Sequence, residues 1–123
     1  IHSLCNTALR EKKILINNGS VQRAFIPSQI FIKVINSIIK KNLFKNLIRN
    51  ISYKNLNLKD IAHIIQKRFE LVFNLDIDII IKKFSYNKNF SIYSNQNFKF
   101  NPINKKIYNE IDQILKFLKK TTN

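Results

Sequence analysis

The segment from residue 28 to residue 41 shows the clearest periodicity in the chain. Its apolar residues recur at helical spacing, and lysine, asparagine and serine occupy the opposite side, which predicts an amphipathic helix. The apolar stripe consists of Ile30, Phe31, Val34, Ile35, Ile38 and Ile39. Ser28 follows an Ile26-Pro27 corner and is placed as an N-cap. A helix of this kind buries its apolar side against other elements, so it constrains the chain to a packed fold.

The same spacing predicts helices at both ends of the chain. A first helix is expected from residue 1 to about residue 16, where Asn17, Asn18 and Gly19 end it. A last helix is expected from residue 107 to residue 120. Between residues 59 and 73, an amphipathic helix competes with a shorter helix followed by a strand over residues 69–73.

Short apolar and alternating segments predict strands between these helices. They cover residues 21–26, 47–53, 77–84 and 90–93, with a turn at residues 86–89. We expect an α+β protein in which two or three amphipathic helices pack on small antiparallel β-sheets and a helix ends the chain. With 123 residues, of which 45% are hydrophobic, the chain can form one domain or two small lobes that share a face. The expected lobes are a helix-strand-helix unit over residues 1–56 and a strand-rich unit with the terminal helix over residues 57–123.

Charge is the strongest indication of a partner. The chain has 22 Lys and Arg residues against 7 Asp and Glu residues, which gives a formal net charge of +15. A domain of this size repels itself at such a charge, so an anionic partner is expected to neutralise it. The candidates are nucleic acid, an anionic membrane surface and an acidic protein. Nucleic acid is favoured because the basic residues are spread along the chain, whereas membrane-surface proteins concentrate them on one helix.

The composition also indicates what kind of genome encodes the chain. Ile, Lys, Asn and Phe dominate the chain, and their codons are AT-rich. Codon bias of this kind raises the number of lysines, but it does not by itself suppress Asp and Glu, so the charge stays a functional indication. The expected location is a mitochondrial ribosome or the ribosome of another AT-rich organelle. The chain begins at Ile1, and both a removed targeting segment and an unusual start fit that beginning.

The sequence contains no pattern typical of catalysis or metal binding. His2 and His63 lie far apart, with no Cys or carboxylate at ligand spacing. Cys5 is the single cysteine, which leaves neither a disulfide framework nor a thiolate metal site within the chain. Gly19 alone cannot form a phosphate-binding loop, which needs several glycines. We therefore expect no enzyme activity, metal, cofactor or small-molecule substrate, and no membrane insertion, because no apolar run approaches roughly 20 residues.

Basic side chains next to aromatic and hydroxyl side chains favour RNA as the partner. Lysine and arginine contact phosphates, and aromatic rings stack on splayed bases. The candidate RNA-binding residues are Arg10, Lys12 and Lys13 at the end of the first helix, and Lys82, Lys83, Ser85, Tyr86, Lys88 and Tyr93 in and after the predicted hairpin. Phe84 and Phe90 of the same region are interpreted as core residues of the sheet.

Four short motifs follow one another in an order that resembles a ribosomal family. They are Ile26-Pro27-Ser28, Leu43-Phe44-Lys45-Asn46-Leu47, Ile81-Lys82-Lys83-Phe84-Ser85 and Ser91-Ile92-Tyr93-Ser94-Asn95. With the order of elements, they resemble ribosomal protein eight of the small subunit. The resemblance implies a protein that binds the central domain of the small-subunit rRNA beside neighbouring ribosomal proteins.

The chain departs from that family in three places. Residues 86–90 replace the family's Pro-Gly turn, and a helix is expected around residues 59–67 where the family has strands. The family's C-terminal Ser-Thr-Ser-Lys-Gly loop, a principal rRNA contact, has no counterpart, because the last predicted helix occupies that end. If the chain belongs to this family, its contacts with RNA have moved to other residues.

Two shorter similarities point to other proteins. Ile14-Leu15-Ile16-Asn17 together with Ile26-Pro27-Ser28 is similar to ribosomal protein four of the small subunit. Lys59-Asp60-Ile61-Ala62 together with Phe69 and Asn74 is similar to the dynein light chain. The sequence thus predicts a structural constituent of an organellar small ribosomal subunit that binds and stabilises rRNA. The alternative is a basic protein-interaction subunit of another organellar complex.

Overall fold

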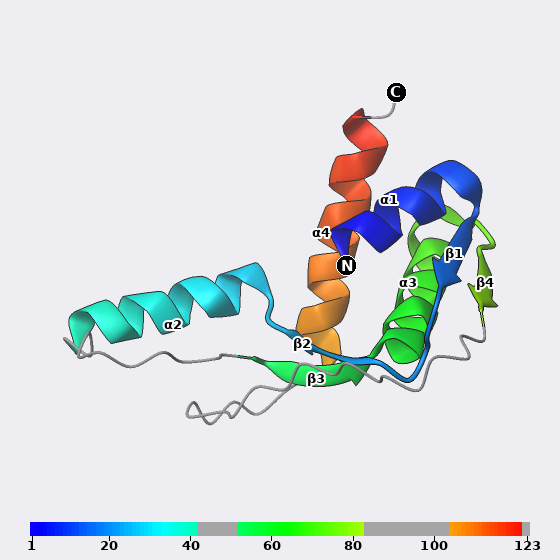
Figure 1. Ribbon diagram of the computed structural model, residues 1–123. Coiled ribbons are helices and arrows are strands. Elements are labelled where there is room, and N and C mark those ends of the chain that lie inside the picture. The colour runs from blue at the N-terminus through cyan, green and yellow to red at the C-terminus, as the bar shows by residue number, and fades with distance from the viewer. Residues whose placement is uncertain (42–51, 83–103, 122–123) are drawn as a thin grey trace.

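The computed structural model describes residues 1–41, 52–82 and 104–121, which form helices and two small sheets (Figure 1). In chain order the elements are α1 (His2–Glu11), β1 (Lys13–Ile16), β2 (Gln22–Phe25), α2 (Ser28–Lys40), β3 (Lys54–Asn57), α3 (Leu58–Phe73), β4 (Asp78–Ile81) and α4 (Asn104–Thr121). The predicted α+β class with a C-terminal helix is confirmed.

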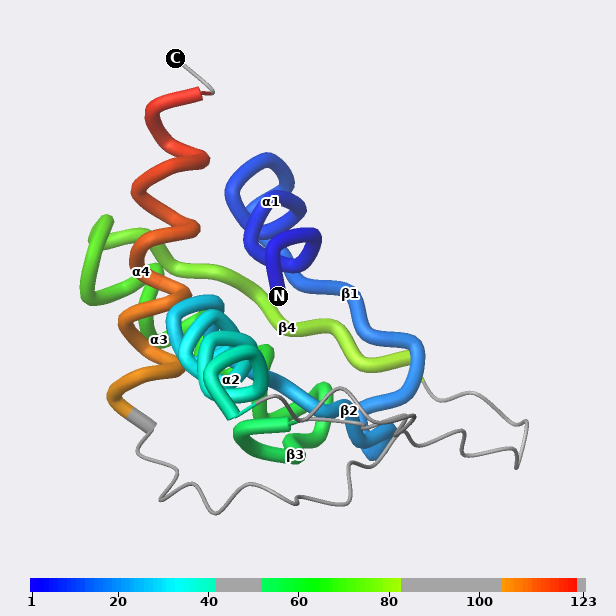
Figure 2. Tube along the Cα trace, turned by 90° about the vertical axis from the view of Figure 1, so that its left-hand side faces the viewer, coloured from blue at the N-terminus to red at the C-terminus, as the bar shows by residue number. Residues whose placement is uncertain are grey.

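The two sheets are pairs of strands that differ in direction. β2 and β3 are antiparallel, the direction expected for the sheets, with Phe25 opposite Lys54. β3 itself lies directly after the strand predicted over residues 47–53. β1 and β4 lie side by side in parallel, with Ile14 opposite Ile79 (Figure 2). The expectation of antiparallel sheets is therefore corrected for this pair. Parallel strands need a long crossover, and α3, directly before β4, returns the chain to the end of the molecule where β1 begins.

The first helix is shorter than the sequence predicts. α1 ends at Glu11, and Lys12 adopts a left-handed conformation with φ 55° and ψ 21°. The Lys12 N–H donates to the carbonyl of Ala8 at 3.0 Å, which closes the helix. In β1, Ile14 and Ile16 are buried and their neighbours are exposed, the alternation of a strand with one covered face. The predicted helix over residues 13–16 was therefore wrong.

Residues 59–73, for which the sequence allows either one helix or a shorter helix followed by a strand, are helical throughout as part of α3. Phe69 is completely buried, and the Phe73 ring meets it edge-on with centroids 5.7 Å apart. Asn74, at φ 52° and ψ 40°, ends the helix. The predicted strand over residues 77–84 is found at Asp78–Ile81. The predicted turn at 86–89, the strand at 90–93 and most of the strand at 47–53 lie outside the described residues.

One hydrophobic core joins the elements. α4 contributes a face at helical spacing that packs against α1 and α3. The core residues of α4 are Ile107, Ile111, Leu115 and Leu118. The core takes in residues on both sides of the predicted boundary between residues 56 and 57, such as Ile14 and Phe69, so the two expected lobes share it.

An ion pair adds to the packing of α4 on α3. The guanidinium of Arg68 donates two hydrogen bonds to the carboxylate of Asp112, Nε to Oδ1 and Nη2 to Oδ2, each 2.6 Å long. The hydrogen bond with Asp112 raises the pKa of Arg68 above its ordinary value. The Arg68 guanidinium also lies 6.0 Å from the centroid of the Tyr108 ring. This bidentate geometry fixes the relative position of α3 and α4 more specifically than a single hydrogen bond does.

Cys5 is a packing residue rather than a reactive thiol. Its side chain is completely buried, and burial raises its pKa from an ordinary value of 9.0 to about 12. Below about pH 9 the thiol is protonated in both the folded and the unfolded chain, so it adds no pH dependence. Above that pH the unfolded chain loses the proton first, which favours unfolding.

We expect the native thiol to resist a fluorescent maleimide at about pH 8 and to react once urea unfolds the chain. From about pH 9 to pH 11, the free energy of unfolding should fall more steeply for the native chain than for Cys5→Ala, which lacks the titrating group. Urea denaturation at several pH values measures both slopes. Equal slopes, or rapid labelling of the folded chain, would contradict this assignment.

Candidate nucleic-acid interface

The acidic side chains are distributed unevenly over the molecule. All seven lie in the described part of the chain. Glu11, Glu70, Asp76 and Asp78 lie where α1 and α3 end and β4 begins. Asp78 is opposite Lys13 in the parallel sheet, and Glu11 pairs with the Lys13 ammonium at 3.4 Å. This end of the molecule therefore carries charges of both signs.

The structure places part of the predicted RNA-binding set. Arg10, Lys12 and Lys13 are exposed at this mixed-charge end. Lys82 is exposed after β4, where its N–H donates to the carbonyl of Ile16 at 2.8 Å. Because β1 and β4 are parallel, Lys82 is separated from Lys13 by the length of the strand pair, roughly 13 Å. The structure therefore does not bring Lys82 next to Lys13.

The remaining predicted residues fall within a stretch that the structure does not describe. They are Lys83, Ser85, Tyr86, Lys88 and Tyr93. Their assignment as RNA contacts stays a prediction from the sequence, and so does the interpretation of Phe84 and Phe90 as core residues.

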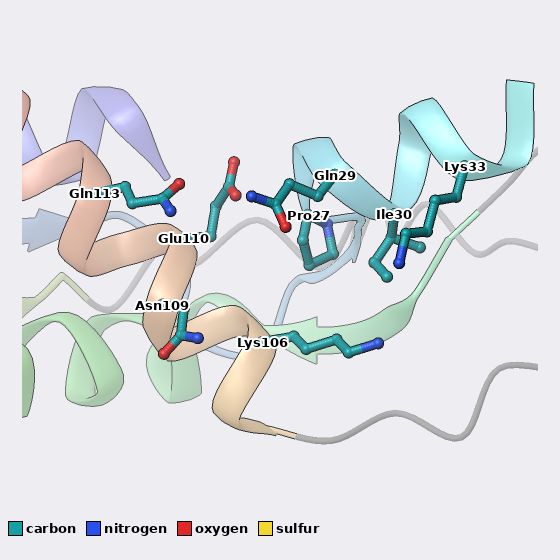
Figure 3. Close-up of a pocket in the computed structure, with 8 residues that line it drawn as sticks. All are labelled: Pro27, Gln29, Ile30, Lys33, Lys106, Asn109, Glu110 and Gln113. Atoms are coloured by element: carbon teal, nitrogen blue, oxygen red, sulfur yellow. The ribbon is translucent and has the colours of Figure 1, made fainter. Parts of the chain in front are cut away.

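A groove between α2 and α4 brings together basic and amide side chains that the sequence analysis does not connect. Its volume is about 260 Å³ (Figure 3). The lining residues are Pro27, Gln29, Ile30, Lys33, Lys106, Asn109, Glu110 and Gln113. Lysine and amide side chains dominate the lining, so most of its polar groups can donate hydrogen bonds.

Two hydrogen bonds between Ser28 and Glu110 tie the walls of this groove together. The Ser28 N–H donates to Oε1 of Glu110 at 3.3 Å, and the Ser28 hydroxyl donates to Oε2 at 3.1 Å. α2 has no acidic residue in its first turn, so Glu110 supplies the negative charge that favours a helix N-terminus. The predicted N-cap at Ser28 was wrong, because Pro27 caps α2 and Ser28 is its first helical residue.

Lys33 and Lys106 give the groove its charge. They come from opposite walls, and Figure 3 shows both side chains directed into the space between the helices. The Lys106 ammonium also lies 6.0 Å from the centroid of the Tyr53 ring, which holds it on the groove side of α4. Glu110 is the one carboxylate in the lining, and it already accepts two hydrogen bonds from Ser28. The groove therefore offers two ammonium groups to an anion.

The exposed side of α4 extends this basic surface. Its polar residues follow one another at alternating steps of three and four, which places them on one line of the helix. They are Lys106, Asn109, Gln113, Lys116 and Lys120, and all are exposed. The acidic residues of α4 lie beside this line, Glu110 bonded to Ser28 and Asp112 bonded to Arg68. A phosphate backbone can contact a row of this kind without meeting an unpaired carboxylate on α4.

The sequence contains a signal for part of this site. The steps of three and four from Lys106 to Lys120 can be recognised in the sequence, and they distinguish these residues from the basic residues spread along the rest of the chain. No pattern in the sequence indicates that Lys33 and Lys106 line the same groove. That arrangement depends on the contact between Ser28 and Glu110, which are 82 residues apart.

Two other types of feature are not found among the described residues. These residues include no group of three His, Cys, Asp or Glu side chains placed to hold a metal ion. None of their helices combines the length and apolar content needed to cross a membrane. Comparison with known proteins gives no family match, and no curated protein or solved structure matches the chain significantly. The function has to be inferred from the residues of the chain itself.

Replacing Glu110 with Ala should loosen the N-terminus of α2, because the Ser28 N–H and hydroxyl lose their acceptor. We expect the amides in the first turns of α2 to lose about 0.5–2 kcal/mol of protection, the range for removal of a helix cap. Native-state hydrogen exchange measures this loss. Gln113→Ala, on the same wall of the groove, is the control and should leave these amides unchanged; equal effects of the two substitutions would contradict the role of Glu110.

Proposed function

We propose that this protein is a structural RNA-binding component of a small ribosomal subunit in a mitochondrion or another organelle with an AT-rich genome. The observation that carries the proposal is the separation of charge in a chain of net charge +15. Of the seven carboxylates, four lie at one end of the molecule, Glu110 and Asp112 accept hydrogen bonds from Ser28 and Arg68, and Asp60 is exposed in the first turn of α3. Lys33, Lys106 and the exposed line of α4 offer cations on another side.

This surface suits the sugar-phosphate backbone rather than individual bases. Lysine ammonium groups are flexible point charges that contact phosphates without reading sequence. The amides of Gln29, Asn109 and Gln113 can donate further hydrogen bonds to phosphate or ribose oxygens. Each neutralised phosphate releases condensed counterions, so binding depends steeply on salt. Such a protein pins RNA helices during assembly and catalyses no reaction.

The family resemblance supports the ribosomal part of the proposal. Ile26 and Pro27 directly precede α2 and Ser28 begins it, as the motif stands before the corresponding helix in ribosomal protein eight of the small subunit. We infer from it the central domain of the small-subunit rRNA as the binding region. In the proposal, α4 makes the contact with RNA that the C-terminal loop makes in that family.

The alternative function is a basic protein-interaction subunit of another organellar complex. One observation favours it, the apolar side chains that α2 leaves exposed, such as Ile32 at 55% and Ile39 at 53%. Apolar surface of this kind is typical of contacts between proteins. A ribosomal protein also contacts neighbouring proteins, so this surface is compatible with both functions, and the dependence of its complex on intact RNA separates them.

The double substitution Lys33→Ala and Lys106→Ala tests the groove directly. We expect it to weaken binding to a small-subunit rRNA fragment and to reduce the slope of log K against log salt by about 1 for each lysine removed. Fluorescence anisotropy over a range of salt concentrations measures both quantities. The far-ultraviolet circular dichroism should stay unchanged, because both side chains are exposed.

The matched control removes two exposed lysines from α3, which also carries Asp60 and Glu70. Lys59→Ala with Lys67→Ala changes the net charge equally and should alter the affinity less. A third variant, with Lys82, Lys83 and Lys88 replaced by Ala, tests the predicted hairpin in the same assay and should also weaken RNA binding without unfolding the chain. An equal loss in the α3 control would show that only net charge matters and would remove the groove as a site.

A further inference from the structure

Within the described part of the chain, most of the apolar side of α2 has no partner. Ile30 and Val34 are buried in the core. Phe31, Ile32, Ile35 and Ile39 are 46%, 55%, 36% and 53% exposed. Figure 1 shows the reason, because α2 extends away from the group formed by α1, α3 and α4 and is nearest to that group at its N-terminal end.

The exposed residues form one continuous stripe. Phe31, Ile35 and Ile39 follow one another at steps of four, and Ile32 lies three residues before Ile35, on the adjacent line of the helix. The stripe therefore spans more than two helical turns. We define these four residues as the α2 stripe.

The charges around the α2 stripe have one sign. Lys40 and Lys41 are exposed at and directly after the end of α2, whereas Lys33 is directed into the groove, and α2 contains no acidic residue. A partner surface that covers the stripe therefore meets ammonium groups at its border. Carboxylates on the partner complement them, and basic groups are repelled.

Three kinds of occupant can be compared. RNA presents phosphates and base edges, and these groups do not complement a row of exposed isoleucines. A second copy would bring another net charge of +15 against the first, with lysines at the border on both sides. A protein helix with an apolar side and flanking carboxylates complements both the apolar stripe and the lysines at its border.

We propose that the α2 stripe docks an amphipathic helix of an acidic partner protein. The apolar side of the partner covers Phe31, Ile35 and Ile39, and its carboxylates face Lys40. This docking surface lies on a different side of α2 from the groove, so it goes beyond RNA binding and does not depend on it.

The probe is a fluorescein-labelled three-heptad helical peptide with Leu at the a and d positions and Glu and Ala elsewhere, titrated into the full chain. We expect Ile35→Asn with Ile39→Asn to weaken peptide binding by about tenfold or more, as for central anchors of an interface. Lys40→Glu should also weaken it. The matched control is Leu71→Asn with Phe117→Asn, which removes apolar side chains that are 69% and 59% exposed on α3 and α4 and should have no effect.

A scrambled peptide of the same composition should bind much more weakly than the amphipathic one. The stripe variant, Ile35→Asn with Ile39→Asn, should keep the circular dichroism spectrum of the native chain and its affinity for the rRNA fragment. Equal binding of the scrambled peptide, or an equal loss in the control variant, would overturn the proposal. So would a dimer in sedimentation equilibrium that the stripe variant dissociates, because the occupant is then a second copy, or a loss of RNA affinity in that variant, because the stripe then faces RNA.

Discussion

Burial of the apolar side of α4 is the interaction on which the rest of the structure depends. Ile107, Ile111 and Leu115 are buried almost completely in the core that α4 shares with α1 and α3. Burial of each such side chain contributes about 1.5–3 kcal/mol. Because this packing fixes the rotation of α4 about its axis, Glu110 meets the first turn of α2 and Lys106 faces the groove.

The same rotation creates the asymmetry of charge. α4 uses its two carboxylates as structural partners, Asp112 for the guanidinium of Arg68 and Glu110 for Ser28, and directs its lysines to solvent. The ion pair with Arg68 neutralises the charge of Asp112, and the hydrogen bonds from Ser28 hold the carboxylate of Glu110 at the N-terminus of α2. The remaining surface of α4 is strongly cationic, and a phosphate backbone neutralises such a surface better than dispersed counterions do.

Local patterns predicted most of the elements, and contacts between distant residues account for what they missed. The helical period from Ile30 to Ile39 is unambiguous, and α2 follows it. In β1, three consecutive apolar residues, from Ile14 to Ile16, fit either a helix or a strand, and the left-handed turn at Lys12 that decides between them has no signature in the sequence. The parallel pairing of β1 with β4 likewise depends on how α3 packs. The groove could not be predicted, because its two lysines meet only after α2 and α4 have docked.

Gradient sedimentation of the tagged protein from a native lysate, with and without ribonuclease, tests RNA binding in the ribosome most directly. We expect the protein to migrate with small-subunit rRNA through a high-salt wash and to leave those fractions after ribonuclease treatment. Migration as free protein, or in a complex that resists ribonuclease, would contradict the ribosomal function and favour the protein-interaction subunit.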